Sequence, residues 1–261
     1  MELRTEALAA WSLADPAAKA AAVHALAAQP AARLDAASEL HAGQAAAGRP
    51  DRPRLVPLSE LPRRTPFTIE GRAALLHAVA HIEFNAINLA LDAVWRFAGM
   101  PQAYYRDWLR VAAEEATHFG LLAGHLASLD HGYGDFEAHD GLWAMTERTA
   151  SDITARMALV PRTLEARGLD ATPPMQERLR RAGDLRAVAI LDIILRDEIG
   201  HVAVGNHWYR WLCERDGLDP LAHYATLAAR HGAPQPKPPF NMAARRMAGF
   251  TADEIDALGR R

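Results

Sequence analysis

Residues 191–212 read LDIILRDEIGHVAVGNHWYRWL, and this stretch decides the fold class. Spacings of three and four residues join seven of its positions into one face of a helix: Leu191, Ile194, Glu198, His201, Gly205, Trp208 and Leu212. An acid and an imidazole, Glu198 and His201, interrupt a face that is otherwise apolar or small. Because a helix in a bundle turns its apolar face to the interior, we expect both polar side chains to be buried.

The same pattern occurs in residues 108–126, where Glu115 and His118 interrupt an apolar face. The helical stretch before it carries one inward acid, Glu83. Glu83 and Glu115 are equally distant in sequence from residue 99, which lies in the turn Gly99-Met100-Pro101. An antiparallel helical hairpin around this turn would therefore place the two acids level with one another.

Four long helical patterns organise the middle of the chain, and no alternating strand pattern competes with them. They cover residues 69–98, 101–128, 140–168 and 175–215, with breaks at 99–101, 131–134 and 168–174. This predicts an all-α four-helix bundle over residues 66–216. Residues 1–65 are expected to form accessory helices and a connector with five prolines between 48 and 66, and residues 217–261 an extended tail that packs on the bundle.

Composition narrows the class of protein. The 261 residues are 50% hydrophobic and 23% charged, which excludes fibrous and broadly disordered proteins. A net charge of −3 provides no positive field for nucleic acid. The single cysteine, Cys213, can form neither an intramolecular disulfide nor a cysteine-based zinc or iron–sulfur site. With no basic leader and no uninterrupted apolar run of membrane-spanning length, we expect a soluble cytoplasmic protein without a membrane segment.

The spacing of acids suggests a duplicated hairpin. Glu165 precedes Glu198 by 33 residues, much as Glu83 precedes Glu115 by 32. One Glu from each of two helices, with Glu-x-x-His from each of the other two, is the ligand set of ferritin-like di-iron and di-manganese carboxylate proteins. The sequence therefore predicts a pair of iron ions, with manganese as the alternative. The six predicted ligands are Glu83, Glu115, His118, Glu165, Glu198 and His201.

Glu147 is a rival to Glu165 as the ligand from the third helix. Glu147 lies 18 residues earlier, which is five full turns and therefore the same helix face. Its midpoint with Glu198 falls in the Thr172-Pro173 turn, as simple hairpin symmetry favours, and Pro161 should kink the helix close to Glu165. The repeat spacing favours Glu165, and the choice between the two acids stays open.

Five segments carry a resemblance to a known family over roughly residues 55–250: HIEFNAI at 81–87, EEATHF at 114–119, LVPRTLEARGLD at 159–170, DEIGHV at 197–202 and KPPFN at 237–241. They resemble an uncharacterised bacterial family within the ferritin-like superfamily. The ligand layout is similar to that of tRNA-modifying di-iron hydroxylases, which implies the same six ligands, with Glu115 and Glu198 bridging the metals. The resemblance also implies that Glu114 and Asp197 orient the ligand histidines.

These observations predict a non-haem dinuclear metal protein that uses O₂ to oxidise an unidentified small molecule. The chain shows no dinucleotide or flavin fingerprint, so electrons would come from a reductase or ferredoxin partner. Two alternatives from other classes are a metal-handling protein, such as a ferroxidase, and a non-catalytic helical interaction module. Transfer RNA as a substrate stays open although no basic stripe supports it, and so does self-association.

Overall fold

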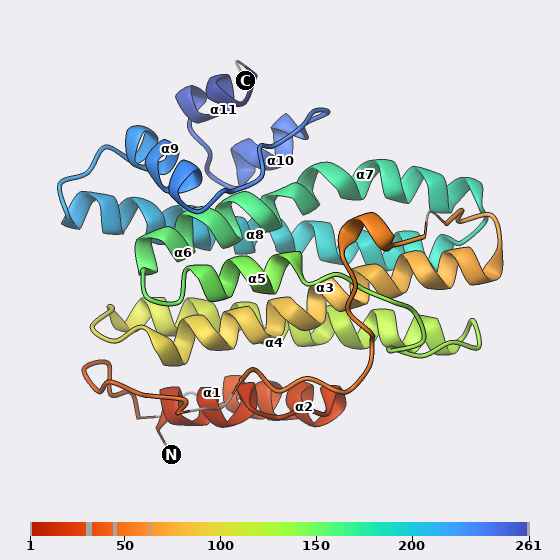
Figure 1. Ribbon diagram of the computed structural model, residues 1–261, viewed down its shortest axis with the longest axis horizontal. Helices are drawn as coiled ribbons and strands as arrows, with labels where there is room; N and C mark the ends of the chain where they lie inside the picture. The colour runs from red at the N-terminus through yellow and green to blue at the C-terminus, as the bar shows by residue number, and fades with distance from the viewer. Residues whose placement is uncertain (1, 30–32, 44–45, 63, 260–261) are drawn as a thin grey trace. The chain divides into compact units, whose positions relative to one another are not determined.

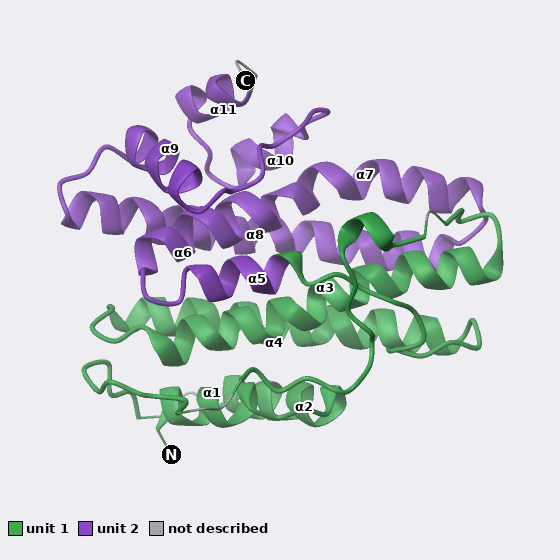
Figure 2. Cartoon of the chain, viewed as in Figure 1, with its two compact units in different colours: residues 1–141 green, residues 142–261 purple. Residues whose placement is uncertain are grey.

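The computed structural model describes residues 2–29, 33–43, 46–62 and 64–259, and the regular structure within them is helical (Figure 1). The only strand-like features in these residues are isolated β-bridges. The all-α class is therefore confirmed. The chain forms two compact units, residues 1–141 and 142–261 (Figure 2). The predicted domain limits at 65/66 and 216/217 stay a prediction.

The first unit is built on a helical hairpin. Helices α3 (Ile69–Arg96) and α4 (Gln102–Ala127) match the predicted stretches to within two residues at each end. Thr68 caps the start of α3 by accepting a hydrogen bond from the backbone N–H of Gly71 at 3.1 Å. Gly99, in the connecting turn, has φ +75°, a conformation that favours glycine. The turn at Gly99 thus allows α3 and α4 to form the hairpin that was predicted to bring Glu83 and Glu115 level with one another.

Two accessory helices, α1 (Leu3–Trp11) and α2 (Pro16–Ala27), precede the hairpin and pack on α3 and α4 respectively; a short 3₁₀ turn, η1, covers Leu58–Glu60. Arg4 is buried and donates to the carbonyls of Val94 and Trp95 in the last turn of α3, at 3.4 and 2.8 Å. A cation at a helix C-terminus satisfies otherwise unpaired carbonyls and complements the helix dipole. Arg4 therefore ties the predicted N-terminal extension to the hairpin.

From the unit boundary onward, the described residues hold seven α-helices and one π-helical segment. They are α5 (Gly141–Arg148, beginning at the unit boundary), α6 (Ile153–Leu159), the π-helical segment η2 (Val160–Glu165), α7 (Ala166–Arg181), α8 (Leu185–Arg215), α9 (Pro220–Arg230), α10 (Met242–Met247) and α11 (Ala252–Gly259). Figure 1 shows α7 and α8 running side by side, as their contacts require.

The prediction of one helix over 140–168 was wrong. The chain leaves the helix after Arg148 and re-enters at Ile153, because the Asp152 carboxylate caps the new helix by accepting from the Ala155 N–H at 2.9 Å. The kink expected at Pro161 takes the form of the π-helical segment, whose second residue is this proline. The stretch predicted as the third helix of the bundle is therefore divided into α5, α6 and the π-helical segment, which leads into α7.

The predicted break at 168–174 was also wrong, since α7 continues through Pro173 and Pro174. Proline has no N–H to donate to the carbonyl four residues earlier. For Pro173 this carbonyl belongs to Leu169, and it accepts a hydrogen bond from the Asn241 side-chain amide at 3.3 Å. The C-terminal segment thus supplies the donor that the helix lacks.

The break lies further along, at Gly183, so α8 begins at Leu185 and not at residue 175. Gly183 has φ +80°, and Asp184 caps α8 by accepting from the Ala187 N–H at 2.9 Å. The last part of the chain, predicted to be extended, is extended over residues 233–239 but holds α9, α10 and α11 on either side. This C-terminal part packs on α8, where the Asn206 side chain donates a hydrogen bond to the Ala248 carbonyl at 2.8 Å.

One helix of the described residues, α3, is long and apolar enough to cross a membrane by composition. Its apolar window is 78% buried inside the protein, as expected of a core helix. The cytoplasmic location stays a prediction.

Candidate metal centre

Three of the predicted ligands meet inside the first unit. Glu83 comes from α3, and Glu115 and His118 come from α4. Nδ1 of His118 lies 3.2 Å from Oε2 of Glu83 and 3.3 Å from Oε2 of Glu115. One ligand atom from each residue lies within 4.8 Å of those of the other two, and all three side chains are buried. The predicted level placement of the two acids is confirmed.

Apolar side chains surround this group, because the same helix faces carry buried residues on the neighbouring turns. Val79 and Ile87 flank Glu83 on α3, and Val111 and Leu122 lie one turn beyond the pair on α4. Charged groups in such surroundings lose the solvation that water gives them. The two carboxylates and the imidazole therefore depend on one another, or on a bound cation.

The electrostatics of the group favour a cation. Burial raises the pKa of Glu83 well above its usual value, and the nearby Glu115 carboxylate raises it further. Burial alone would lower the pKa of His118, but hydrogen bonds to Glu115 and Glu83 outweigh it, so the pKa of the imidazole is raised. Both shifts favour the protonated form, so the group gains positive charge next to its two buried carboxylates. A divalent metal ion would supply that positive charge with the same oxygen and nitrogen atoms as ligands.

The second unit holds the other three predicted ligands. Glu198 and His201 lie one turn apart on α8, with His201 Nδ1 3.8 Å from Glu198 Oε1. Glu165 is the last residue of the π-helical segment. The exposed fractions of Glu165, Glu198 and His201 are 6%, 8% and 0%, so all three acquire the burial that their face predicted. Within the described residues, Glu165 belongs to no group of three ligand side chains as tight as that around His118.

A glycine of α8 positions the π-helical segment. A Cβ atom at Gly205 would lie 2.5 Å from Cβ of Pro161, far inside van der Waals contact. Glycine at this position therefore allows Pro161 to rest directly on α8. Since π-helical turns inside longer helices occur frequently at functional sites, the geometry that precedes Glu165 is consistent with a ligand role.

The rival acid, Glu147, lies on α5 and is exposed, whereas Glu165 is buried. A carboxylate that binds metal inside a bundle must point to the interior. Burial thus favours Glu165. Metal binding by the six residues stays a prediction.

The two acids expected to orient the histidines both carry ion pairs on the outside of their helices. The Glu114 carboxylate lies 3.1 Å from Nη1 of Arg110, and the Asp197 carboxylate lies 2.8 Å from Nε of Arg196. Each acid is partly exposed. Their action on His118 and His201 stays a prediction.

A second polar row on α3 was not recognised as a unit from the sequence. His77 and His81 are both buried packing residues. His81 contacts the Tyr133 hydroxyl at 2.9 Å and the Asn85 amide at 3.0 Å, and His77 accepts from the Gly134 N–H at 2.9 Å. Burial lowers the pKa of His77 to about 4 and that of His81 to about 3. The four-residue spacing of His77, His81 and Asn85 was the available signal.

Comparison with known proteins agrees with the resemblance at the level of the family. Residues 12–256 match the model of a family described as "Protein of unknown function (DUF455)". A protein of Haemophilus influenzae, called an uncharacterized protein, is 55% identical over 214 residues, which cover 79% of this chain and 74% of that protein. No solved structure matches. The match spans nearly the whole chain, which therefore belongs to the DUF455 family.

Proposed function

We propose that this protein is a non-haem dinuclear iron carboxylate protein of the ferritin-like type, with manganese as the alternative metal, which oxidises a small organic molecule with O₂. The observation that carries the proposal is the buried group in the first unit, where His118 Nδ1 lies 3.2 and 3.3 Å from two carboxylates on different helices. Buried acids that are expensive to ionise without a cation are typical of a metal site.

The donor chemistry supports iron or manganese. Carboxylate oxygens and imidazole nitrogens suit these metals better than metals that prefer thiolate ligands. Cys213 is the single cysteine of the chain and is absent from the predicted ligand set. Four carboxylates with two neutral imidazoles would balance the charge of two divalent ions. The ligand number and charge therefore fit a metal pair.

Each half of the chain would contribute one set of ligands. Glu83, Glu115 and His118 would hold one ion, and Glu165, Glu198 and His201 the other. When bound, the metal pair would supply the reduction of O₂. The protein's own contribution is to hold the ligands on rigid helices and to exclude water with apolar neighbours such as Val111 and Leu122. An electron-donor protein and a small organic substrate complete the proposal.

The test is the metal content of matched variants after anaerobic loading with Fe(II). Glu115→Gln removes an oxygen ligand with little change in shape, and we expect it to lose most of the bound iron. Glu147→Gln, at the exposed rival acid, is the control and should keep the iron content of the unchanged protein. Full iron content in Glu115→Gln would contradict the site, and loss in Glu147→Gln would give the ligand role to the rival.

The same preparations separate the alternative functions. Exposure to O₂ with consumption of Fe(II) but no oxidation of any organic molecule, including in the presence of a reductase, favours a metal-handling protein. Absence of iron and manganese uptake in the unchanged protein favours an interaction module.

A further inference from the structure

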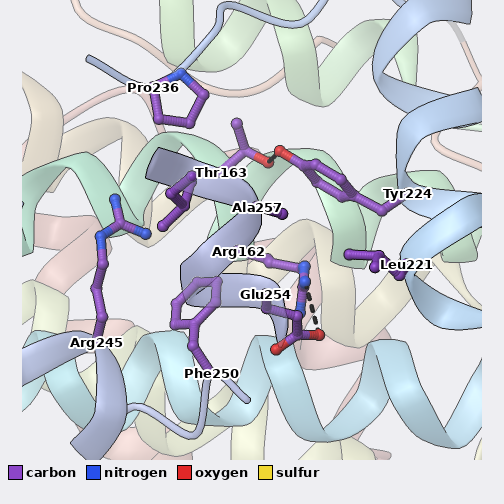
Figure 3. A pocket seen from close by; sticks show the side chains of 10 residues that line it. Arg162, Thr163, Leu221, Tyr224, Pro236, Arg245, Phe250, Glu254 and Ala257 are labelled. Carbon is purple, nitrogen blue, oxygen red and sulfur yellow. Dashed lines mark hydrogen bonds and ion pairs between the residues drawn. The ribbon is translucent and has the colours of Figure 1, made fainter. Parts of the chain in front are cut away.

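The second unit contains a small pocket that none of the six predicted ligands lines (Figure 3). Its walls come from the π-helical segment, α9, the chain before α10, α10 itself, and the region of α11. Its volume is about 40 Å³. The residues that matter for its chemistry are Arg162, Thr163, Tyr224, Arg245, Phe250 and Ala257.

Two buried guanidinium groups dominate the polar part of the wall. Arg162 is 5% exposed and Arg245 is 1% exposed. Both lie over the ring of Phe250, at 5.1 and 5.2 Å from its centroid, and Figure 3 shows the two arginines with this ring between them. The pocket therefore concentrates positive charge around one aromatic side chain.

The acids nearby do not use all of this charge. Glu254 pairs with Arg162 at 2.8 Å and also with Arg210 at 2.8 Å, and Asp170 pairs with Arg245 at 2.5 Å. Three guanidinium groups thus face two carboxylates. Glu254 itself lines the pocket, but both its oxygens already accept from arginines, which offset its negative charge toward a further anion.

Donor groups also remain. Nε of Arg162 is buried and donates no hydrogen bond within the described residues. Arg245 bonds to Asp170 through Nε and Nη2, and no acceptor among the described residues takes its Nη1. A buried N–H without an acceptor is rare in proteins and calls for a partner such as an ion or ligand. Arg162 already donates from Nη1 to Asn206 and from Nη2 to Glu254, so it offers Nε, while Arg245 offers Nη1; a carboxylate can accept one hydrogen bond from each.

The remainder of the wall sets the size and shape of the ligand. Leu221, Pro236, Ala257 and Leu258 are apolar, and the hydroxyls of Thr163 and Tyr224 bond to one another at 2.9 Å. About 10–15 Å³ of such space holds one water-sized group, so this pocket admits about three or four non-hydrogen atoms. A small ligand with one anionic end and a short apolar stem fits both the charge and the lining.

We propose that this pocket binds a two-carbon carboxylate, with the carboxylate on Arg162 and Arg245 and the methyl group against Ala257. The site goes beyond the proposed metal function and does not depend on it. Binding can be measured on the full chain whether or not metal is present.

The test is calorimetric titration with acetate and with its neutral counterpart, acetamide. We expect a Kd for acetate of about 1 mM or tighter, and binding of acetamide at least about tenfold weaker, since the amide lacks the charge. Ala257→Phe fills the pocket and should weaken acetate binding at least about tenfold. Ala252→Phe, at an exposed position of the same helix that does not line the pocket, should leave the Kd unchanged.

Three results would overturn the proposal. These are no binding of acetate to the unchanged protein, equal binding of acetate and acetamide, and inorganic phosphate binding in place of acetate. The comparison of acetate with acetamide uses the unchanged protein, so the test stands even if Ala257→Phe fails to fold.

Discussion

The hairpin α3–α4 and the hairpin α7–α8 carry the same kind of buried acid at the same depth in their second helices, but the segments that carry the other predicted acid differ. Glu115 lies 13 residues after Gln102, the first residue of α4, and Glu198 lies 13 residues after Leu185, the first residue of α8. Glu83, in contrast, sits within one unbroken helix, whereas Glu165 ends a π-helical segment that follows a break. Helices α4 and α8 are therefore alike in the position of their acid. The second unit differs in that Glu165 ends a π-helical segment.

This difference has consequences for stability and charge. In the first unit the predicted ligands lie close together, with His118 Nδ1 3.2 Å from Oε2 of Glu83. In the second unit His201 Nδ1 lies 3.8 Å from Glu198, and Glu165 depends on the packing of Pro161 against Gly205. We expect the first group to respond most to loss of a ligand, and the second to respond most to changes in helix packing.

The largest effect is expected from His118→Ala in metal-free protein. The substitution removes the positive partner of two buried carboxylates, which typically costs about 3–5 kcal/mol. His201→Ala should cost less, because its carboxylate partner is more distant. Urea unfolding of both variants measures the difference. An equal loss of stability in His118→Ala and His201→Ala would contradict the expectation that the charged groups interact more strongly in the first unit than in the second.

Gly205→Ala should destabilise the second unit by about 1–3 kcal/mol, because the added methyl group overlaps Pro161. Gly200→Ala is the matched control on α8, where a Cβ meets nothing within 4 Å. The control should be neutral or more stable by up to about 1 kcal/mol, since alanine favours helices. Thermal and urea unfolding distinguish the two; if Gly205→Ala matches its control, Pro161 does not need this close approach.

Acid should destabilise the first unit through His77 and His81, whose pKa values burial lowers. The pKa of His77 in the folded protein is lowered to about 4, so the unfolded chain binds more protons than the folded one between about pH 6.5 and pH 4. The stabilising effect of the neutral imidazole is therefore present above pH 6.5 and is lost as the pH falls toward 4. His77 alone contributes a slope of up to about 1.4 kcal/mol per pH unit.

Urea midpoints of the unchanged protein and of His77→Gln, measured from pH 7 to pH 4.5, test this slope. The variant should show a flatter dependence, because glutamine does not titrate. Carboxylates that titrate in the same range are common to both proteins and cancel in the comparison. Parallel curves would rule out His77 as a source of acid sensitivity.

The smallest effect concerns the donor that lets α7 pass through its prolines. Asn241→Ala removes the hydrogen bond to the Leu169 carbonyl and the cap of α10, at a cost of about 1–2 kcal/mol. In a Pro173→Ala background the helix can donate to this carbonyl itself, so the same substitution should cost less. A double-mutant cycle measures the coupling. Additive effects would show that Asn241 does not compensate for Pro173.

The sequence was most informative where local spacing determined the structure. The positions of Glu83, Glu115 and His118 follow from helix periodicity and from one turn at Gly99, and the structure brings all three together. The extent of α7 could not be predicted in this way, because the donor for the Leu169 carbonyl comes from Asn241, more than 70 residues later. A proline pair is a strong local signal for a break, and a tertiary contact overrides it.

Other differences had local signals that periodicity alone concealed. Asp152 and Asp184 each cap a new helix, and Gly183 marks the end of α7, so capping residues would have placed both breaks. The buried row of His77, His81 and Asn85 lies off the helix face that carries Glu83, so the periodicity that predicts an inward Glu83 does not indicate it. The pocket around Phe250 depends on contacts between segments far apart in sequence, such as Arg162 with Glu254, and no spacing predicts it.

The most direct test of the central claim is the stoichiometry of iron bound by the unchanged protein. The protein is loaded with Fe(II) without oxygen, freed of unbound iron by gel filtration, and analysed for iron and protein. Two iron ions per chain, with an oxo-bridge absorption appearing on exposure to air, is the predicted result. No bound iron, together with no uptake of manganese, would contradict a dinuclear metal centre.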